Sequence, residues 1–148
     1  MKRIFTAIVA MAFLALAITS PARAQLPGTS MRANIPFDFI VNGKTLPAGK
    51  YEVRRITDAP EGLIIRSVDS KHDHAMFETE SLQQNRMARH DELVFDRYGD
   101  SYFLSEVLVG GMETGRRLAP SRAEKQLRRE SEMASNNAQP ETVSIALY

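Results

Sequence analysis

The chain has 148 residues, with 19 Lys and Arg against 18 Asp and Glu and no cysteine. This composition is ordinary for a soluble globular protein, and the length is sufficient for one hydrophobic core. The lack of cysteine excludes a disulfide scaffold, a thiolate metal site, a cysteine nucleophile and a lipid-modified N-terminal cysteine.

The first 24 residues have the organisation of a secretory signal peptide. A positive start is followed by an apolar run over residues 4–18 and by the small-x-small sequence Ala22-Arg23-Ala24. As a helix the apolar run would reach about 22 Å, which is short of a hydrocarbon core of about 30 Å and argues against a membrane anchor. We therefore expect cleavage between Ala24 and Gln25, and export to the periplasm or the extracellular space.

Removal of this segment changes the charge balance. It holds three of the 19 basic residues and no acidic one, so the other 124 residues carry 16 basic against 18 acidic groups, a net charge of −2. The expected mature domain is mildly acidic. Burial and sheet hydrogen bonds must stabilise it, because disulfides are absent.

The mature chain begins with a lead-in and a strand. Residues 25–30 are expected to be flexible. Over 31–41 apolar and polar residues alternate, which is typical of a strand with one buried face. Because Pro36 cannot donate a ladder hydrogen bond, this strand is expected at a sheet edge or at a bulge. Asn42-Gly43 then predicts a tight hairpin turn, and 46–49 a second turn.

Short strands are predicted at regular intervals along the domain. They cover residues 51–56, 63–68, 74–80, 92–98 and 101–109, with turns at 58–62, 69–73 and 99–100 and a loop or short helical turn over 81–91. The turn at Gly99-Asp100 predicts a hairpin that pairs Phe95 with Leu104 and Val94 with Ser105.

A helix and a final strand close the chain. Ser121 and Glu124 have the spacing of a capping box, which predicts a short surface helix over about 122–130. Residues 131–141 have the composition of a linker. Alternation resumes over 142–148, which is expected to return to a sheet as the last strand, either in its own chain or in another.

These elements indicate an all-β fold with a β-rich domain over 31–130. About seven strands and one short late surface helix favour an antiparallel β-sandwich or a small barrel.

A specific motif lies in residues 33–53. The sequence Ala-Asn-Ile-Pro-Phe-Asp-Phe over 33–39, followed by Leu-Pro-Ala-Gly-Lys-Tyr-Glu-Val over 46–53, resembles the IPFDF…LPAGxYxV opening of a group of small exported proteins of soil bacteria. The resemblance implies export and a β-rich domain. That group has no assigned activity, so it implies no catalytic residues.

Three histidines are the candidates for a metal site. His72 and His74 would point to the same side of an extended segment, and a third ligand would come from His90, Asp91 or Glu78. The alternative interpretation is a solvated turn, and it is the favoured one, because zinc sites need three or four ligands with supporting contacts.

The sequence supports catalysis even less than it supports a metal site. The chain has no Gly-x-Ser-x-Gly or Ser-x-x-Lys sequence and no phosphate-binding glycine loop. Glu78 and Glu80 share a strand face and could pair as acid and base, but an exposed polar face explains them as well. The sequence therefore predicts no catalytic residue and no cofactor.

Basic residues gather in a C-terminal segment. Over 116–130 six of them face only Glu124 and Glu130, so this segment carries +4 and the rest of the mature domain −6. The six are Arg116, Arg117, Arg122, Lys125, Arg128 and Arg129. Such asymmetry is compatible with contact to an anionic surface, such as lipid headgroups or an acidic polymer. The alternative, a solvated helix with internal Glu–Arg pairs, is the favoured interpretation.

The sequence thus predicts an exported, non-enzymatic binding or accessory module of unknown ligand, whose partner is an anionic envelope surface or a protein. Nucleic acid is not expected, because the basic segment lacks stacking aromatic residues. The alternative is a metal-binding or hydrolytic protein that uses His72, His74 and a third ligand.

Overall fold

The computed structural model describes residues 30–84, 87–134 and 139–148. The predicted signal peptide, with its cleavage site at Ala24 and Gln25, lies outside the described residues, as do residues 25–29 of the lead-in. The described chain is mostly β, as predicted, with one short helix. Its elements are β1 (Met31–Ile35), β2 (Phe39–Val41), β3 (Lys44–Leu46), β4 (Gly49–Ile56), β5 (Ala59–Ser67), β6 (His74–Gln83), β7 (Glu92–Tyr98), β8 (Ser101–Leu108), β9 (Thr114–Leu118), α2 (Arg122–Ala134) and β10 (Glu141–Ala146).

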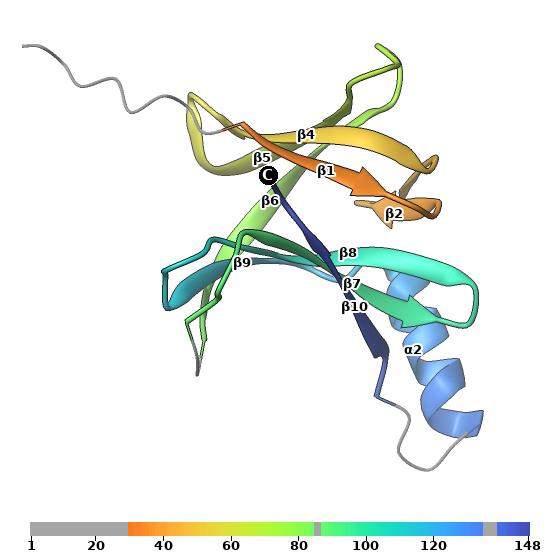
Figure 1. Cartoon of the computed structure of the whole chain (residues 1–148). Helices are drawn as coiled ribbons and strands as arrows, with labels where there is room; N and C mark the ends of the chain where they lie inside the picture. The colour runs from red at the N-terminus through yellow and green to blue at the C-terminus, as the bar shows by residue number, and fades with distance from the viewer. Residues whose placement is uncertain (1–29, 85–86, 135–138) are drawn as a thin grey trace, which may run out of the picture.

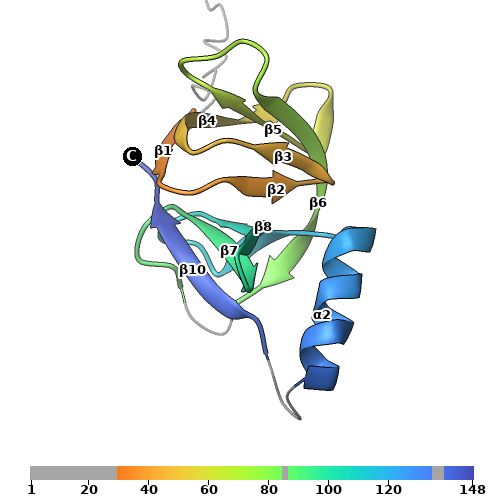
Figure 2. The same ribbon diagram turned by 90° about the vertical axis from the view of Figure 1, so that its right-hand side faces the viewer.

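The ten described strands form one mixed sheet. The prediction of about seven strands in an antiparallel arrangement is wrong in both respects, because β2 and β8 pair in parallel. The strand order is β1-β4-β5-β6-β9-β8-β2-β3, and β7 pairs with both β8 and β10. Figure 1 shows β1, β4 and β5 as one group of strands and β7, β8 and β10 as another. The long strand β6 links the two groups, because its first half pairs with β5 and its second half with β9 (Figure 2).

The predicted single strand over 31–41 is wrong. The chain forms two strands there, and β1 pairs with β4 while β2 pairs with β3 and β8. Pro36 lies at the break, where its fixed φ and missing N–H end the first ladder and let the chain pass between the two groups. The predicted buried face is confirmed, since Ala33, Ile35, Phe39 and Val41 are all buried.

The turn at Asn42-Gly43 is confirmed, and the turn predicted over 58–62 is wrong. Asn42 and Gly43 have φ values of 49° and 78°, as a two-residue hairpin turn of this kind requires. Residues 59–62 instead belong to β5, and Ala59 pairs with Ile56 across a register shift between Arg55 and Ile56. The Pro-Glu-Gly sequence is thus accommodated within a strand.

The β7–β8 hairpin is confirmed, but its predicted register holds only near the turn. Phe95 lies opposite Leu104, whereas a shift between Val94 and Phe95 places Val94 opposite Glu106. The predicted pairing of Val94 with Ser105 is therefore wrong, because a bulge adds one residue to β8. One consequence is that Val107 reaches the core, at 1% exposure.

Aromatic side chains join the two groups of strands. The ring of Phe39 lies edge-on to those of Tyr51 and Phe95, with centroids 5.0 and 5.5 Å apart. Phe37, which follows the break at Pro36, stacks on Tyr102 at 3.9 Å. Such pairs add about 0.5–1.5 kcal/mol each beyond the burial of their area.

The last strand returns to its own chain. β10 pairs antiparallel with β7, with Val143 opposite Phe95. Beyond β10, Tyr148 and Arg32 exchange backbone hydrogen bonds of 3.1 and 2.9 Å. The C-terminal residues therefore contact both β7 and the edge strand β1.

The predicted capping box is confirmed at the start of α2. The Glu124 N–H donates to Ser121 Oγ and the Ser121 N–H donates to Glu124 Oε2, both at 3.2 Å. The helix continues to Ala134, four residues beyond its predicted end, so residues 131–134 are not linker. Residues 135–138 of that linker lie outside the described residues. None of the helical structure that is described is long and apolar enough to cross a membrane.

Candidate functional site

The fold divides the six basic residues predicted as a contact surface. Arg116 and Arg117 lie on β9, where the Arg117 Nη2 is 2.6 Å from Glu106 Oε1 of β8. Arg128 lies on α2, with its Nε 3.7 Å from Glu132 Oε1. The charges of Arg117 and Arg128 are therefore partly balanced by carboxylates of the fold.

The other three basic residues share one exposed face of α2. Arg122, Lys125 and Arg129 line a shallow groove of about 390 Å³ together with Gln126. Their spacing of three and four positions places them on one side of a helix, in a row about 10 Å long. Figure 2 shows α2 standing beside the strands rather than between them. We call these four residues the basic face of α2.

The side of α2 that carries Glu124 and Arg128 has a different electrostatic environment. Burial raises the pKa of Glu124; the hydrogen bond from Ser121 opposes this rise, and the nearby Asp96 adds to it. Burial likewise raises the pKa of Asp96, which accepts a hydrogen bond from Ser105 Oγ at 3.3 Å. Arg128 lowers the pKa of both carboxyls, so its charge acts within the fold.

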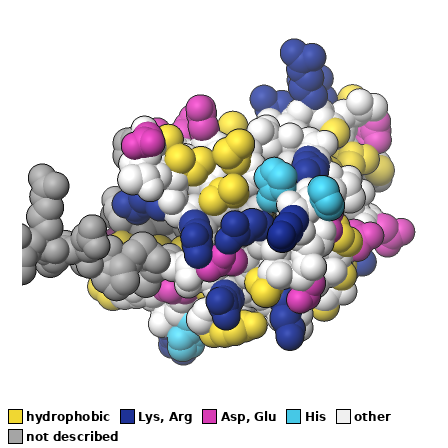
Figure 3. All heavy atoms as spheres, turned by 90° about the horizontal axis from the view of Figure 1, so that it is seen from above, with side chains coloured by type: hydrophobic (Ala, Val, Ile, Leu, Met, Phe, Trp, Pro, Cys, Tyr) yellow, Lys and Arg dark blue, Asp and Glu magenta, His cyan; other side chains and the backbone are white. Residues whose placement is uncertain are grey.

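A second basic surface lies over β1, β4 and β5, and no pattern in the sequence predicts it. Figure 3 shows basic side chains gathered on the upper face of the molecule. Arg32, Arg54, Arg66 and Lys71 line a groove there of about 670 Å³. Strand pairing places the three arginines together, since both Arg32 and Arg66 lie opposite Glu52 in the ladders. Lys71 lies in the turn between β5 and β6.

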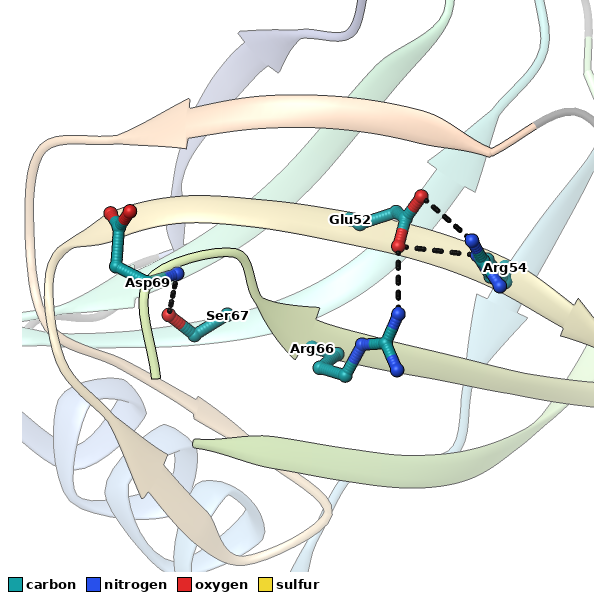
Figure 4. A network of polar contacts seen from close by, with 5 residues as sticks. All are labelled: Glu52, Arg54, Arg66, Ser67 and Asp69. Atoms are coloured by element: carbon teal, nitrogen blue, oxygen red, sulfur yellow. Dashed lines mark hydrogen bonds and ion pairs between the residues drawn. The ribbon is translucent and has the colours of Figure 1, made fainter. Parts of the chain in front are cut away.

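Glu52 holds two of these arginines (Figure 4). Its Oε2 is 3.1 Å from Arg66 Nη2 and 3.2 Å from Arg54 Nε, and the residue is only 8% exposed. Burial by itself would raise the pKa of Glu52, but hydrogen bonds from Ser30, Arg66 and Arg54 outweigh it and lower the pKa. Arg54 and Arg66 thus satisfy a buried carboxylate, which makes this surface a weaker candidate for an external anion.

Glu52→Gln should make the domain less stable at neutral pH and less sensitive to acid. A carboxyl whose pKa is lowered on folding contributes stability above its ordinary pKa of 4.5 and loses it as the pH falls through the lower folded value. We expect a loss of about 1–3 kcal/mol at pH 7, and a flatter decline between about pH 5 and pH 3. Urea denaturation across this pH range measures both effects.

The matched control is Glu141→Gln. The Glu141 side chain is 67% exposed and pairs with Arg97 at 3.1 Å, so its replacement should leave both stability and acid sensitivity nearly unchanged. An acid decline in Glu52→Gln as steep as that of the wild type would contradict the assignment of the Glu52 network.

The three candidate metal ligands are not brought together. His72 and His74 precede or begin β6, and their carbonyl oxygens accept hydrogen bonds from Lys44 Nζ at 3.3 and 2.8 Å. His90 lies in another loop, beside Gly110. In the parts of the chain that the structure describes, no group of three or more His, Asp or Glu residues is arranged to hold a metal ion. The segment with His72 and His74 is thus a turn that is hydrogen-bonded to Lys44 of the β2–β3 hairpin.

The basic face of α2 is therefore the part of the predicted contact surface that the fold presents as a unit. The residues that line its groove are all exposed and include no acidic side chain. No family model, curated protein or solved structure matches the chain.

Proposed function

We propose that the chain is an exported, non-enzymatic accessory module that associates with anionic lipid headgroups through the basic face of α2. One observation carries the proposal: Arg122, Lys125 and Arg129 line a common groove on an exposed helix face. The proposal includes cleavage of the signal peptide after Ala24 and a location in the periplasm or outside the cell.

The expected attraction is weak and depends on salt. A basic residue close to an anionic membrane contributes about 1 kcal/mol, so three contribute about 3 kcal/mol, or roughly a 150-fold enrichment. The Debye length is about 8 Å at physiological ionic strength, so added salt screens the attraction. The mature chain carries +4 over residues 116–130 and −6 elsewhere. An anionic membrane attracts the basic face and repels the acidic remainder, and this separation of charge orients the molecule.

A lipid surface suits this face better than a ligand of fixed shape. The side chains of Arg122, Lys125 and Arg129 are long and exposed, so they adapt to headgroups whose positions vary. A ligand of defined shape would need a preformed concave site with converging polar groups.

We infer further that the sheet closes into a small barrel, which would hold α2 on a rigid support. The hydrogen bonds between Tyr148 and Arg32 support this inference, because they connect the end of β10 with the edge strand β1. The continuity of β6 between the two groups of strands supports it on the other side.

Reversing the charge of the basic face should abolish membrane association. We expect the mature chain to sediment with phosphatidylglycerol vesicles at low salt and the triple variant Arg122→Glu, Lys125→Glu, Arg129→Glu to bind about 100-fold more weakly. The matched control is the triple variant Lys50→Glu, Arg55→Glu, Lys71→Glu, which changes three exposed basic residues outside α2 and has the same net charge.

The control should keep binding within a few-fold of the wild type. An equal loss in both variants would show that net charge alone acts, and would overturn the proposal. So would equal binding to neutral phosphatidylcholine vesicles, or binding to an acidic polysaccharide without binding to anionic vesicles.

A further inference from the structure

A half-open pocket lies between the β2–β3 hairpin, β5, β6 and the start of α2, in the region where these elements meet in Figure 2. Its volume is about 430 Å³, which is within the usual range for small-molecule sites. Apolar side chains form much of its wall, among them Ile40, Ile56, Met76, Phe103 and Leu118.

Gly62 allows the residues of this wall to pack closely together. A Cβ added to Gly62 would lie 3.0 Å from the Ala59 Cβ and 3.1 Å from the Ile56 Cδ1, so a larger residue would displace both. The pocket is thus shaped by packed residues of β4 and β5 as well as by the hairpin and the helix.

The charged groups of the pocket are all negative. Among the described residues that line it, the ionisable side chains are Glu78 on β6, which is exposed, and Glu124 on α2, which is 7% exposed. The capping box fixes the Glu124 side chain, because its Oε2 accepts the Ser121 N–H at 3.2 Å. Arg128 and Lys125 act on this carboxyl from the helix itself. A cation bound in the pocket would stabilise it further, because a buried carboxylate is costly without charge partners or donors.

We propose that this pocket binds a small primary amine with an apolar body, whose ammonium group meets the Glu124 carboxylate while the body lies against Ile40, Met76 and Phe103. An ammonium group supplies three donors and a positive charge, which suits a carboxylate held at an apolar wall. A ligand with a carboxylate would be repelled by both glutamates, and a neutral alcohol would form a weaker hydrogen bond. This proposal does not rest on the membrane association proposed above, because it uses other residues and a ligand of opposite charge.

Three probes of equal chain length test the ligand class. We expect hexylamine to bind the mature chain saturably, with a Kd of about 1 mM or below. Hexanol should bind at least about tenfold more weakly, because a charge-assisted hydrogen bond is lost. Hexanoate should show no saturable binding. Titrations followed by ¹⁵N-HSQC spectra measure the three affinities and report which amides respond.

Glu124→Gln tests the residue without removing the helix cap. Glutamine also serves at this position of a capping box, so the variant should fold, which circular dichroism checks. Its affinity for hexylamine should fall about tenfold or more and approach that for hexanol. Glu130→Gln, an exposed position on the same helix, is the matched control and should bind hexylamine like the wild type. Failure of hexylamine to saturate, unchanged affinity in Glu124→Gln, or hexanoate binding as tight as that of hexylamine would each overturn the proposal.

Discussion

Replacing Phe39 with alanine should lower the free energy of unfolding by about 3–5 kcal/mol. The Phe39 side chain is fully buried, and its ring packs edge-on against Tyr51 and Phe95, from the two groups of strands. Its truncation removes apolar burial and leaves a cavity where the groups meet, since neighbouring strands can collapse only in part. Urea denaturation followed by circular dichroism measures the change.

The control for this variant is Met133→Ala. Met133 is 84% exposed near the end of α2, so its truncation should change the free energy of unfolding by less than about 0.5 kcal/mol. A loss below about 1 kcal/mol in Phe39→Ala would contradict a core shared by the two groups of strands.

Removing residues 139–148 should unfold the domain or cause it to aggregate. Val143 and Ile145 of β10 are half-buried against the core, and Leu147 is buried in it. A fully buried apolar side chain contributes about 1.5–3 kcal/mol, so we expect a loss of more than about 4 kcal/mol. That is close to the whole stability of many small domains, about 5–15 kcal/mol. The truncation also leaves the edge of β7 unpaired, which promotes association.

A peptide distinguishes the loss of this strand from a general failure to fold. A synthetic peptide of residues 139–148, added in excess, should restore the circular dichroism and the denaturation transition by pairing with β7. Tyr148→Ala is the control and should leave the stability of the full chain nearly unchanged. The Tyr148 side chain is 73% exposed, and its hydrogen bonds to Arg32 use the backbone. A truncated domain as stable as the full chain would contradict the role of β10.

Features determined by neighbouring residues could be predicted from the sequence. The turn at Asn42-Gly43 depends on two positive φ values, which these residues adopt readily. The capping box needs only Ser121 and Glu124 at the right spacing. The alternation of apolar residues likewise predicts the buried face of β1 and β2, although Pro36 predicts an edge or a bulge where the structure has a break between two strands.

Features determined by strand pairing could not be predicted in the same way. The bulge at Ser105 of β8 shifts the register by one residue, which no local pattern indicates. Glu52 and Arg66 meet because β4 and β5 pair in one particular register. For the candidate site, helical spacing brings Arg122, Lys125 and Arg129 together. The β8–β9 pairing instead places Arg117 opposite Glu106, so Arg117 forms an ion pair within the sheet and is not part of the basic face.

The proposed function is tested most directly by locating the membrane-facing residues. The mature, ¹⁵N-labelled chain would be mixed with phosphatidylglycerol vesicles that carry a nitroxide on a headgroup, and the broadening of each backbone amide signal would be measured. We expect the strongest broadening at Arg122, Lys125 and Arg129, with the signals of Arg54 and Arg66 nearly unaffected. Broadening centred on β4 and β5, or broadening at none of these residues, would contradict membrane association through the basic face of α2.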